Sequence, residues 1–172
     1  MATAIVTLMS VAFLIMGVSS MAQGSFKSIT VLSDAWTQME DISEEQSRTR
    51  IEVIETSHSP PTVDVTVKNA GSKSLENFSA WDVLSEYYDA GGAYYTTTLT
   101  YTTAASPGDD EWTVTGIYLD ASGSVAEVFQ PNVFNPEEEM VVRLKLSPAA
   151  RTSSLNLLVI GTPNGVSVST MY

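Results

Sequence analysis

The sequence contains no cysteine, so disulfide bonds, thiolate metal sites and cysteine nucleophiles are all excluded. Histidine is almost absent as well. His58 is the only one, and it stands in the turn-like stretch His58-Ser59-Pro60-Pro61. A Ser-His-Asp triad would have to use this residue as its general base. We interpret His58 as a loop residue, and the sequence therefore offers no candidate for nucleophilic catalysis.

Basic side chains are also scarce. The 172 residues include 8 Lys and Arg against 20 Asp and Glu, a formal net charge of -12. Nucleic-acid binding requires basic groups that neutralise phosphates, so this balance argues against it, and against docking on an anionic membrane face. The P-loop, the dinucleotide fingerprint, the nucleophile elbow and the zincin motif are all missing. We predict that the chain is not an enzyme and uses no cofactor.

Two acidic runs are candidates for a calcium site. Asp109, Asp110 and Glu111 follow a Pro-Gly pair, and three glutamates occupy 137–139. Neither run has the alternating ligands of an EF-hand loop. We interpret both as solvated turns and expect no metal site.

The N-terminal segment is apolar. Residues 1–26 carry no charged side chain, a length that as a helix would just cross a bilayer. Three interpretations compete: a signal peptide, a membrane anchor, and a helix that packs against copies of itself. Ser20-Met21-Ala22 resembles a cleavage site, but no basic residues precede the apolar run. Ser20 and Gly24 form a small-xxx-small pair, which permits close helix approach.

The helical pattern continues beyond this run. Apolar residues recur every three or four positions to Ile42, and no proline occurs before Pro60. A helix of about 50 residues would be about 75 Å long, so it needs partners along its length. We expect it to form a filament core packed through Phe13, Gly17, Ser20, Gly24, Phe26, Ile29, Leu32, Trp36, Met39 and Ile42.

From Ile51 onward the pattern alternates with a period of two. Val63, Val65 and Val67 alternate with polar residues, and turn clusters recur every 10 to 15 residues or so. The sequence therefore predicts an α+β chain: a long N-terminal hydrophobic α-helix over 1–50, followed by an immunoglobulin-like antiparallel β-sandwich of about seven to nine strands over 51–172.

This layout resembles the archaellin-type members of the type IV pilin superfamily. The resemblance covers the whole chain, and its best local segments are 63–71 (VDVTVKNAG), 134–138 (FNPEE) and 162–166 (TPNGV). They look like β-domain segments of archaellins and of the related archaellum stator subunits. Bacterial pilins usually carry Glu at the fifth mature position. If Met1 is the mature start, Ile5 occupies that position here, and this departure from bacterial pilins fits archaellins.

The resemblance implies a structural subunit of an extracellular archaellum filament used for motility. Such a subunit would be held in the membrane first, then be transferred by the assembly machinery into a homopolymer. Two alternatives stay open: a membrane-anchored archaellum stator subunit that binds the cell envelope, and an adhesive type IV-like pilin.

Glycans are a further expected partner. Asn77-Phe78-Ser79 is an N-glycosylation sequon, and we predict modification at Asn77. The Thr-rich stretch 96–103 could carry O-linked sugars, but Thr also suits an exposed strand face, and we favour the latter interpretation.

Overall fold

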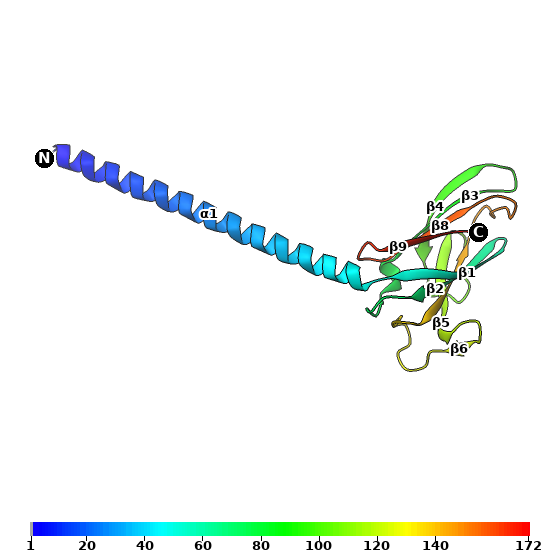
Figure 1. Cartoon of the computed structure of the whole chain (residues 1–172). Coiled ribbons are helices and arrows are strands. Elements are labelled where there is room, and N and C mark those ends of the chain that lie inside the picture. Colours follow the sequence, from blue (N-terminus) through cyan, green and yellow to red (C-terminus); the bar gives the residue numbers. More distant parts are fainter. Residues whose placement is uncertain (1) are drawn as a thin grey trace. The chain divides into compact units, whose positions relative to one another are not determined.

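The computed structural model describes residues 2–172, except for the side chains of residues 2–5 and 22–29. It contains one long helix and nine strands (Figure 1). The helix α1 spans Ala2–Arg48 and is followed by β1 (Ile51–Ser59), β2 (Thr62–Asn69), a short 3-10 helix (Phe78–Ala80), β3 (Asp82–Tyr88), β4 (Tyr94–Tyr101), β5 (Glu111–Asp120), β6 (Val125–Ala126), β7 (Glu139–Lys145), β8 (Leu157–Gly161) and β9 (Ser167–Met171).

The chain separates into two compact units, Met1–Ser43 and Glu44–Tyr172. The last turn of α1 therefore belongs to the β-domain, by which we mean the second unit. Arg48 pairs with Glu44 across one helical turn at 3.5 Å, as the i, i+4 spacing predicts. The next residue, Glu45, pairs with Lys73 of the β-domain. The predicted functional division at residue 50 stays a prediction.

The nine strands form one continuous hydrogen-bonded path rather than two separate sheets. Its order is β1-β2-β7-β5-β4-β3-β8-β9, with β6 attached to β5. Every pair is antiparallel except β4 with β5, which run parallel over two residue pairs: Thr100 with Glu111 and Tyr101 with Trp112. The ends of the path nearly meet, because Thr56 of β1 and Thr170 of β9 bring their hydroxyl oxygens within 3.3 Å.

The fold class expected from the sequence, a hydrophobic helix followed by an antiparallel immunoglobulin-like sandwich, was therefore wrong. The β-domain is a nearly closed nine-stranded sheet with a parallel contact, because β4 crosses to β5 and joins what would be the two halves of a sandwich. Among the residues described, no helix is both long enough and apolar enough to cross a membrane.

Alternating strands supply the core. On β2 the three valines Val63, Val65 and Val67 are fully buried, and their partners on β7 are equally inaccessible. Each fully buried side chain of this size contributes roughly 1.5–3 kcal/mol from the loss of apolar surface. The largest fully buried side chains are Trp112, Tyr87, Phe134, Met140, Leu144, Leu146, Leu158 and Ile160. The alternating pattern predicted for β2 and β7 is thus confirmed.

One local expectation was wrong. His58 does not lie in a loop but near the end of β1, where it pairs with Val63 of β2. The Pro60-Pro61 pair makes the turn itself, and the strand extends up to it, to Ser59.

Candidate functional site

The end of α1 enters the β-domain through a hydrogen-bonded network that we call the helix-end junction (residues 45–49, 69–73, 134–138 and 162–166). Asn164 contacts the helix end directly. Its side-chain amide nitrogen donates to the Thr49 hydroxyl at 2.7 Å, and its main-chain carbonyl oxygen accepts from the side-chain amide of Gln46 at 2.8 Å. The junction therefore joins the loop between β8 and β9 to the last helical turn.

Gly71 lies where the loop after β2 passes the helix end. A Cβ atom at this position would lie 2.4 Å from the carbonyl oxygen of Arg48 and 2.7 Å from the nitrogen of Arg50. Both are main-chain atoms, which cannot swing aside as a side chain would. The loop is held close by hydrogen bonds from Ser72 N to Arg48 O and from Ala70 N to Arg50 O, each 2.8 Å. Only glycine fits this approach.

Asn69 holds two further loops. It is fully buried, and its amide nitrogen donates to the carbonyl oxygens of Lys73 at 2.8 Å and Phe134 at 2.9 Å. Its side-chain oxygen accepts from Gly71 N at 3.1 Å. Glu138, 5% exposed, caps the neighbouring loop by accepting from Asn135 N at 2.6 Å. A buried polar group that is satisfied in this way positions the backbone around it.

The three segments that carry the family resemblance thus meet at one place. Segment 63–71 ends in Asn69 and Gly71, segment 134–138 supplies Phe134 and Glu138, and segment 162–166 contains Asn164. From the sequence alone these segments were only motif matches. The structure shows that segments 63–71 and 162–166 contact the helix end directly, whereas segment 134–138 holds Asn69 beside it.

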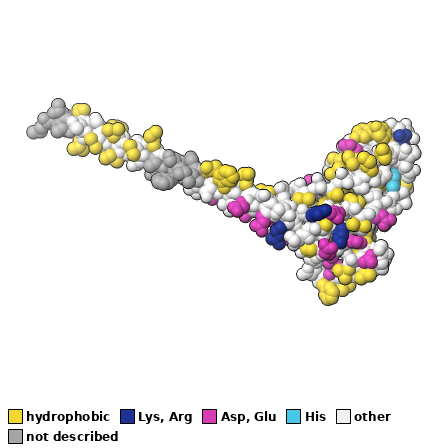
Figure 2. Space-filling view, viewed as in Figure 1, with side chains coloured by type: hydrophobic (Ala, Val, Ile, Leu, Met, Phe, Trp, Pro, Cys, Tyr) yellow, Lys and Arg dark blue, Asp and Glu magenta, His cyan; other side chains and the backbone are white. Residues whose placement is uncertain are grey.

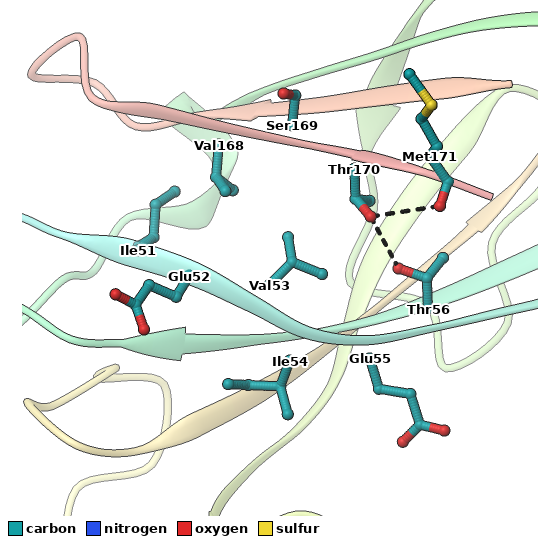
Figure 3. A pocket seen from close by; sticks show the side chains of 10 residues that line it. All are labelled: Ile51, Glu52, Val53, Ile54, Glu55, Thr56, Val168, Ser169, Thr170 and Met171. Atoms are coloured by element: carbon teal, nitrogen blue, oxygen red, sulfur yellow. Dashed lines mark hydrogen bonds between the residues drawn. The ribbon is translucent and has the colours of Figure 1, made fainter.

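A second candidate site is the shallow groove between the two ends of the sheet path (Figure 3). It has a volume of about 660 Å³ and is lined by 51–56 of β1 and 168–171 of β9. Val53, Thr56, Val168 and Thr170 point toward the space between the strands, whereas Ile54 and Glu55 point away from it. The groove is thus uncharged along its floor.

His58 and Tyr172 pack at the Ser59 end of β1. Their rings lie edge to face with centroids 5.0 Å apart. Burial lowers the pKa of His58, against an opposing hydrogen bond with the Ala150 backbone, so its neutral form is favoured. Burial raises the pKa of Tyr172 to about 12, although its hydroxyl lies 2.6 Å from that of Ser85. Ser85 is therefore paired with a phenol and not with the imidazole that a nucleophilic serine requires.

A third candidate surface is an apolar loop around β6. Leu119, Val125, Val128 and Phe129 are 55%, 48%, 73% and 87% exposed. Figure 2 shows apolar side chains gathered at the end of the β-domain where Figure 1 places β6. The loop is ordered by Glu127, whose carboxylate accepts hydrogen bonds from the backbone nitrogens of Phe129 and Gln130. Exposed apolar groups held in place in this way are typical of protein interaction sites.

The predicted filament-core residues lie on α1, and most are exposed. Phe13, Leu32, Trp36, Met39 and Ile42 are 54–73% accessible, and nothing lies within 4 Å of a Cβ placed on Gly17. Ser20 is exposed too. The side chains at Gly24, Phe26 and Ile29 lie outside the described residues. Whether these positions pack against other copies stays a prediction.

The carboxylates of each acidic run bind different partners and do not converge on one point. Asp109 pairs with Lys145 at 2.6 Å, Asp110 accepts from Ser147 N, and Glu111 accepts from Gly108 N. In the second run Glu137 pairs with Lys68 at 2.7 Å, whereas Glu139 accepts from Ala121 N. Within the described part of the chain, no three potential metal ligands come together.

Asn77 is exposed and adopts a left-handed backbone (φ 54°) just before the 3-10 helix. The Ser79 hydroxyl donates to the Asn77 side-chain oxygen at 2.8 Å, so the two sequon side chains already contact each other. Modification at this residue stays a prediction.

No family model matches the sequence, and no curated protein matches it either. Solved structures do. The archaellum periplasmic stator protein FlaG from Sulfolobus acidocaldarius aligns at 21% identity and a TM-score of 0.51, over 72% of this chain and 99% of FlaG. The FlaF and FlaG complex from the same organism gives 22% identity and a TM-score of 0.52, over 72% of this chain and 89% of that chain.

A third structure, the archaeal flagellum of Methanospirillum hungatei, aligns over 95% of this chain and 90% of its own at 16% identity, but its TM-score of 0.46 is too low to support an argument. The first two alignments cover about the share of the chain that Glu44–Tyr172 represents. The β-domain is therefore similar in fold to an archaellum periplasmic stator protein.

Proposed function

We propose that this chain is a structural, non-enzymatic component of an archaellum, and that it acts as a stator-type subunit outside the cytoplasm. One observation carries the proposal: the β-domain is similar in fold to FlaG over 99% of the solved FlaG chain. This interpretation was the alternative to a filament subunit in the sequence analysis, and the comparisons favour it.

The surfaces of the β-domain support a role in protein binding. The β1–β9 groove and the apolar loop around Phe129 are both accessible, and neither brings together an acid, a base and a nucleophile. FlaG itself occurs in a complex with FlaF. A stator-type subunit must hold a partner firmly, and exposed apolar side chains on an ordered loop provide such a contact.

The charge balance supports a location outside the cytoplasm. The 20 acidic against 8 basic side chains suit a solvated surface outside the cell and repel nucleic acid. Its role in the archaellum would be to bridge the machinery and a partner in the cell envelope. The helix-end junction would then transmit force between the last turn of α1 and the β-domain through hydrogen bonds to Asn164 and the close contact at Gly71.

A filament subunit is the second candidate, and one observation favours it. Trp36, Met39 and Ile42 are exposed on α1 together with apolar side chains nearer its start. Packing of such side chains against neighbouring helices would stabilise the assembly by roughly 25 cal/mol for each Å² of apolar surface that it buries. A homopolymer through α1 would provide that cover, as would a partner helix in a stator.

Fractionation of the native cells tests the proposal. Filaments are sheared from the surface and purified, and the chain is quantified by mass spectrometry in the fibres and in the washed cell envelope. A stator-type subunit stays in the envelope fraction and is a trace component of the fibres. If the chain makes up most of the fibre mass, the proposal is wrong and the filament subunit is correct.

A further inference from the structure

The strand β4 has one edge that is mostly unpaired. Along its other edge it pairs with β3 over six residue pairs, from Tyr88 with Tyr94 to Val83 with Leu99. Toward β5 it pairs only at Thr100 and Tyr101. Figure 1 shows the β3–β4 hairpin extending away from the β5 side. Within the described chain, residues 94–99 thus have no strand on that side.

The direction of the main-chain groups on this edge follows from one hydrogen bond. Thr100 N donates to Asp110 O at 3.0 Å, so the main-chain groups of Thr100 face the β5 side. In an antiparallel strand every second residue presents its N–H and C=O on the same side. Tyr94, Thr96 and Thr98 therefore direct their N–H and C=O groups to the open edge, and their side chains are exposed.

This edge lacks the features that keep other edges from pairing. Edge strands are usually protected by charges, prolines or bulges. On β1 the groups Glu52 and Glu55 and a bulge between Val53 and Glu55 supply that protection. The stretch 94–99 reads Tyr-Tyr-Thr-Thr-Thr-Leu and has no charge, no proline and no glycine. In a chain with a net charge of -12, a neutral strand edge of this length is a place where another strand can approach.

We propose that β4 pairs with β4 of a second copy of this chain, antiparallel, with the two-fold axis at Thr96. Thr96 then lies opposite Thr96 of the second copy, and Tyr94 lies opposite Thr98. In this register the outward main-chain groups form about six hydrogen bonds, two for each of three facing pairs. The sheet of each copy continues into the other as β8-β3-β4 joined to β4-β3-β8.

The charges select a second copy as the occupant. In the two-fold register every side chain of 94–98 faces an uncharged residue, so no carboxylate lies opposite another despite the net charge of -12 on each copy. Pairing over five or six residues buries less than the ~1,200 Å² below which associations are weak and reversible. The dimer is therefore concentration-dependent. This inference concerns the β-domain alone and does not depend on the proposed function.

Disulfide trapping tests the register, because the chain has no cysteine of its own. The full-length variant Thr96→Cys is oxidised and analysed on a non-reducing gel. Facing residues of a hydrogen-bonded pair have Cα atoms about 5.5 Å apart, within the ~4.4–6.8 Å that a disulfide requires. We expect a covalent dimer with Thr96→Cys and none with the matched control Thr98→Cys, whose equivalents lie far apart. Equal trapping of both variants, or of neither, overturns the proposal.

Two substitutions at the axis test the association without a covalent bond. Thr96→Lys places two cations opposite each other, whereas Thr96→Val keeps a neutral β-branched side chain at the same exposed position. By sedimentation of the full chain, Thr96→Lys should weaken dimerisation at least about tenfold, that is ~1.4 kcal/mol, and Thr96→Val should leave it unchanged. Association through α1 would be insensitive to residue 96, so an unchanged dimer in Thr96→Lys contradicts the β4 interface. Circular dichroism checks that both variants stay folded.

Discussion

At the scale of single residues, Gly71 shows how a short motif acquires a physical meaning. In the sequence, Gly71 only ends the segment 63–71 that carries the family resemblance, and the structure adds the reason for the glycine, which is main-chain contact with Arg48 and Arg50. Periodicity along a strand carries no information about which distant segment approaches a turn. The roles of Asn69, Gly71 and Asn164 at one junction could therefore not be predicted from spacing alone.

Gly71→Ala should destabilise the β-domain by roughly 1–3 kcal/mol, because the methyl group would overlap main-chain atoms at 2.4 and 2.7 Å. Gly161→Ala is the matched control. Its Cβ would meet nothing closer than 3.8 Å, so we expect a change of less than ~0.5 kcal/mol. Denaturant unfolding of both variants measures the difference. Equal stability of the two variants would mean that the helix end is not held against the loop.

His58 should make stability depend on pH. Burial lowers its folded-state pKa below the unfolded value of 6.5, so both states are neutral above that value. As the pH falls below 6.5 the unfolded chain takes up the proton first, and stability declines until the pH passes the folded pKa. Thermal unfolding between about pH 7 and 5 should show a decline that His58→Gln reduces. A variant with the same pH dependence as the parent would exclude His58 as its source.

At the same scale, Asn77 is the predicted sugar attachment site. Intact mass of the protein from its native cells should exceed the sequence mass, and Asn77→Gln and Ser79→Ala should each remove the excess, because the sequon needs both side chains. An excess that persists in both variants would assign the modification to other residues. An unmodified parent would show that the sequon is not used.

At the scale of elements, the end of α1 is held by the β-domain through Asn164, Gln46 and Thr49. In Asn164→Ala the side-chain hydrogen bonds to Thr49 Oγ1 and to Glu45 O are lost, whereas the bond from Gln46 to the main-chain oxygen of residue 164 remains. Amide hydrogen exchange in Glu44–Thr49 should then become at least about tenfold faster, whereas the strands keep their protection. Ser169→Ala, an exposed position on β9, serves as the control. Unchanged exchange in Asn164→Ala would show that the contacts of Gly71 and Lys73 are enough to hold the helix end in place.

The strands themselves were largely predictable, and their order was not. Alternation located β2, β5 and β7, because a strand with one face in a core must place an apolar residue at every second position. The same pattern is satisfied by an antiparallel sandwich and by the observed path, in which β4 runs parallel to β5. Which strands pair depends on long-range packing, and a periodicity of two does not encode it.

At the scale of the whole molecule, the β-domain is similar in fold to an archaellum periplasmic stator protein, and it exposes an apolar loop around Phe129. The sequence led us toward a filament subunit because the helical pattern continues past the apolar run to Ile42, and a helix of that length needs partners. Comparison of the β-domain in three dimensions led us to propose a stator-type subunit instead, because similarity of fold persists at sequence identities where motifs become weak.

The most direct measurement of the central claim is immunogold labelling of this chain on intact, archaellated cells. We predict gold particles at the base of each archaellum, within the cell envelope, and bare filaments beyond it. Gold distributed along the full length of the filaments would contradict the stator-type role and would assign the chain to the filament itself.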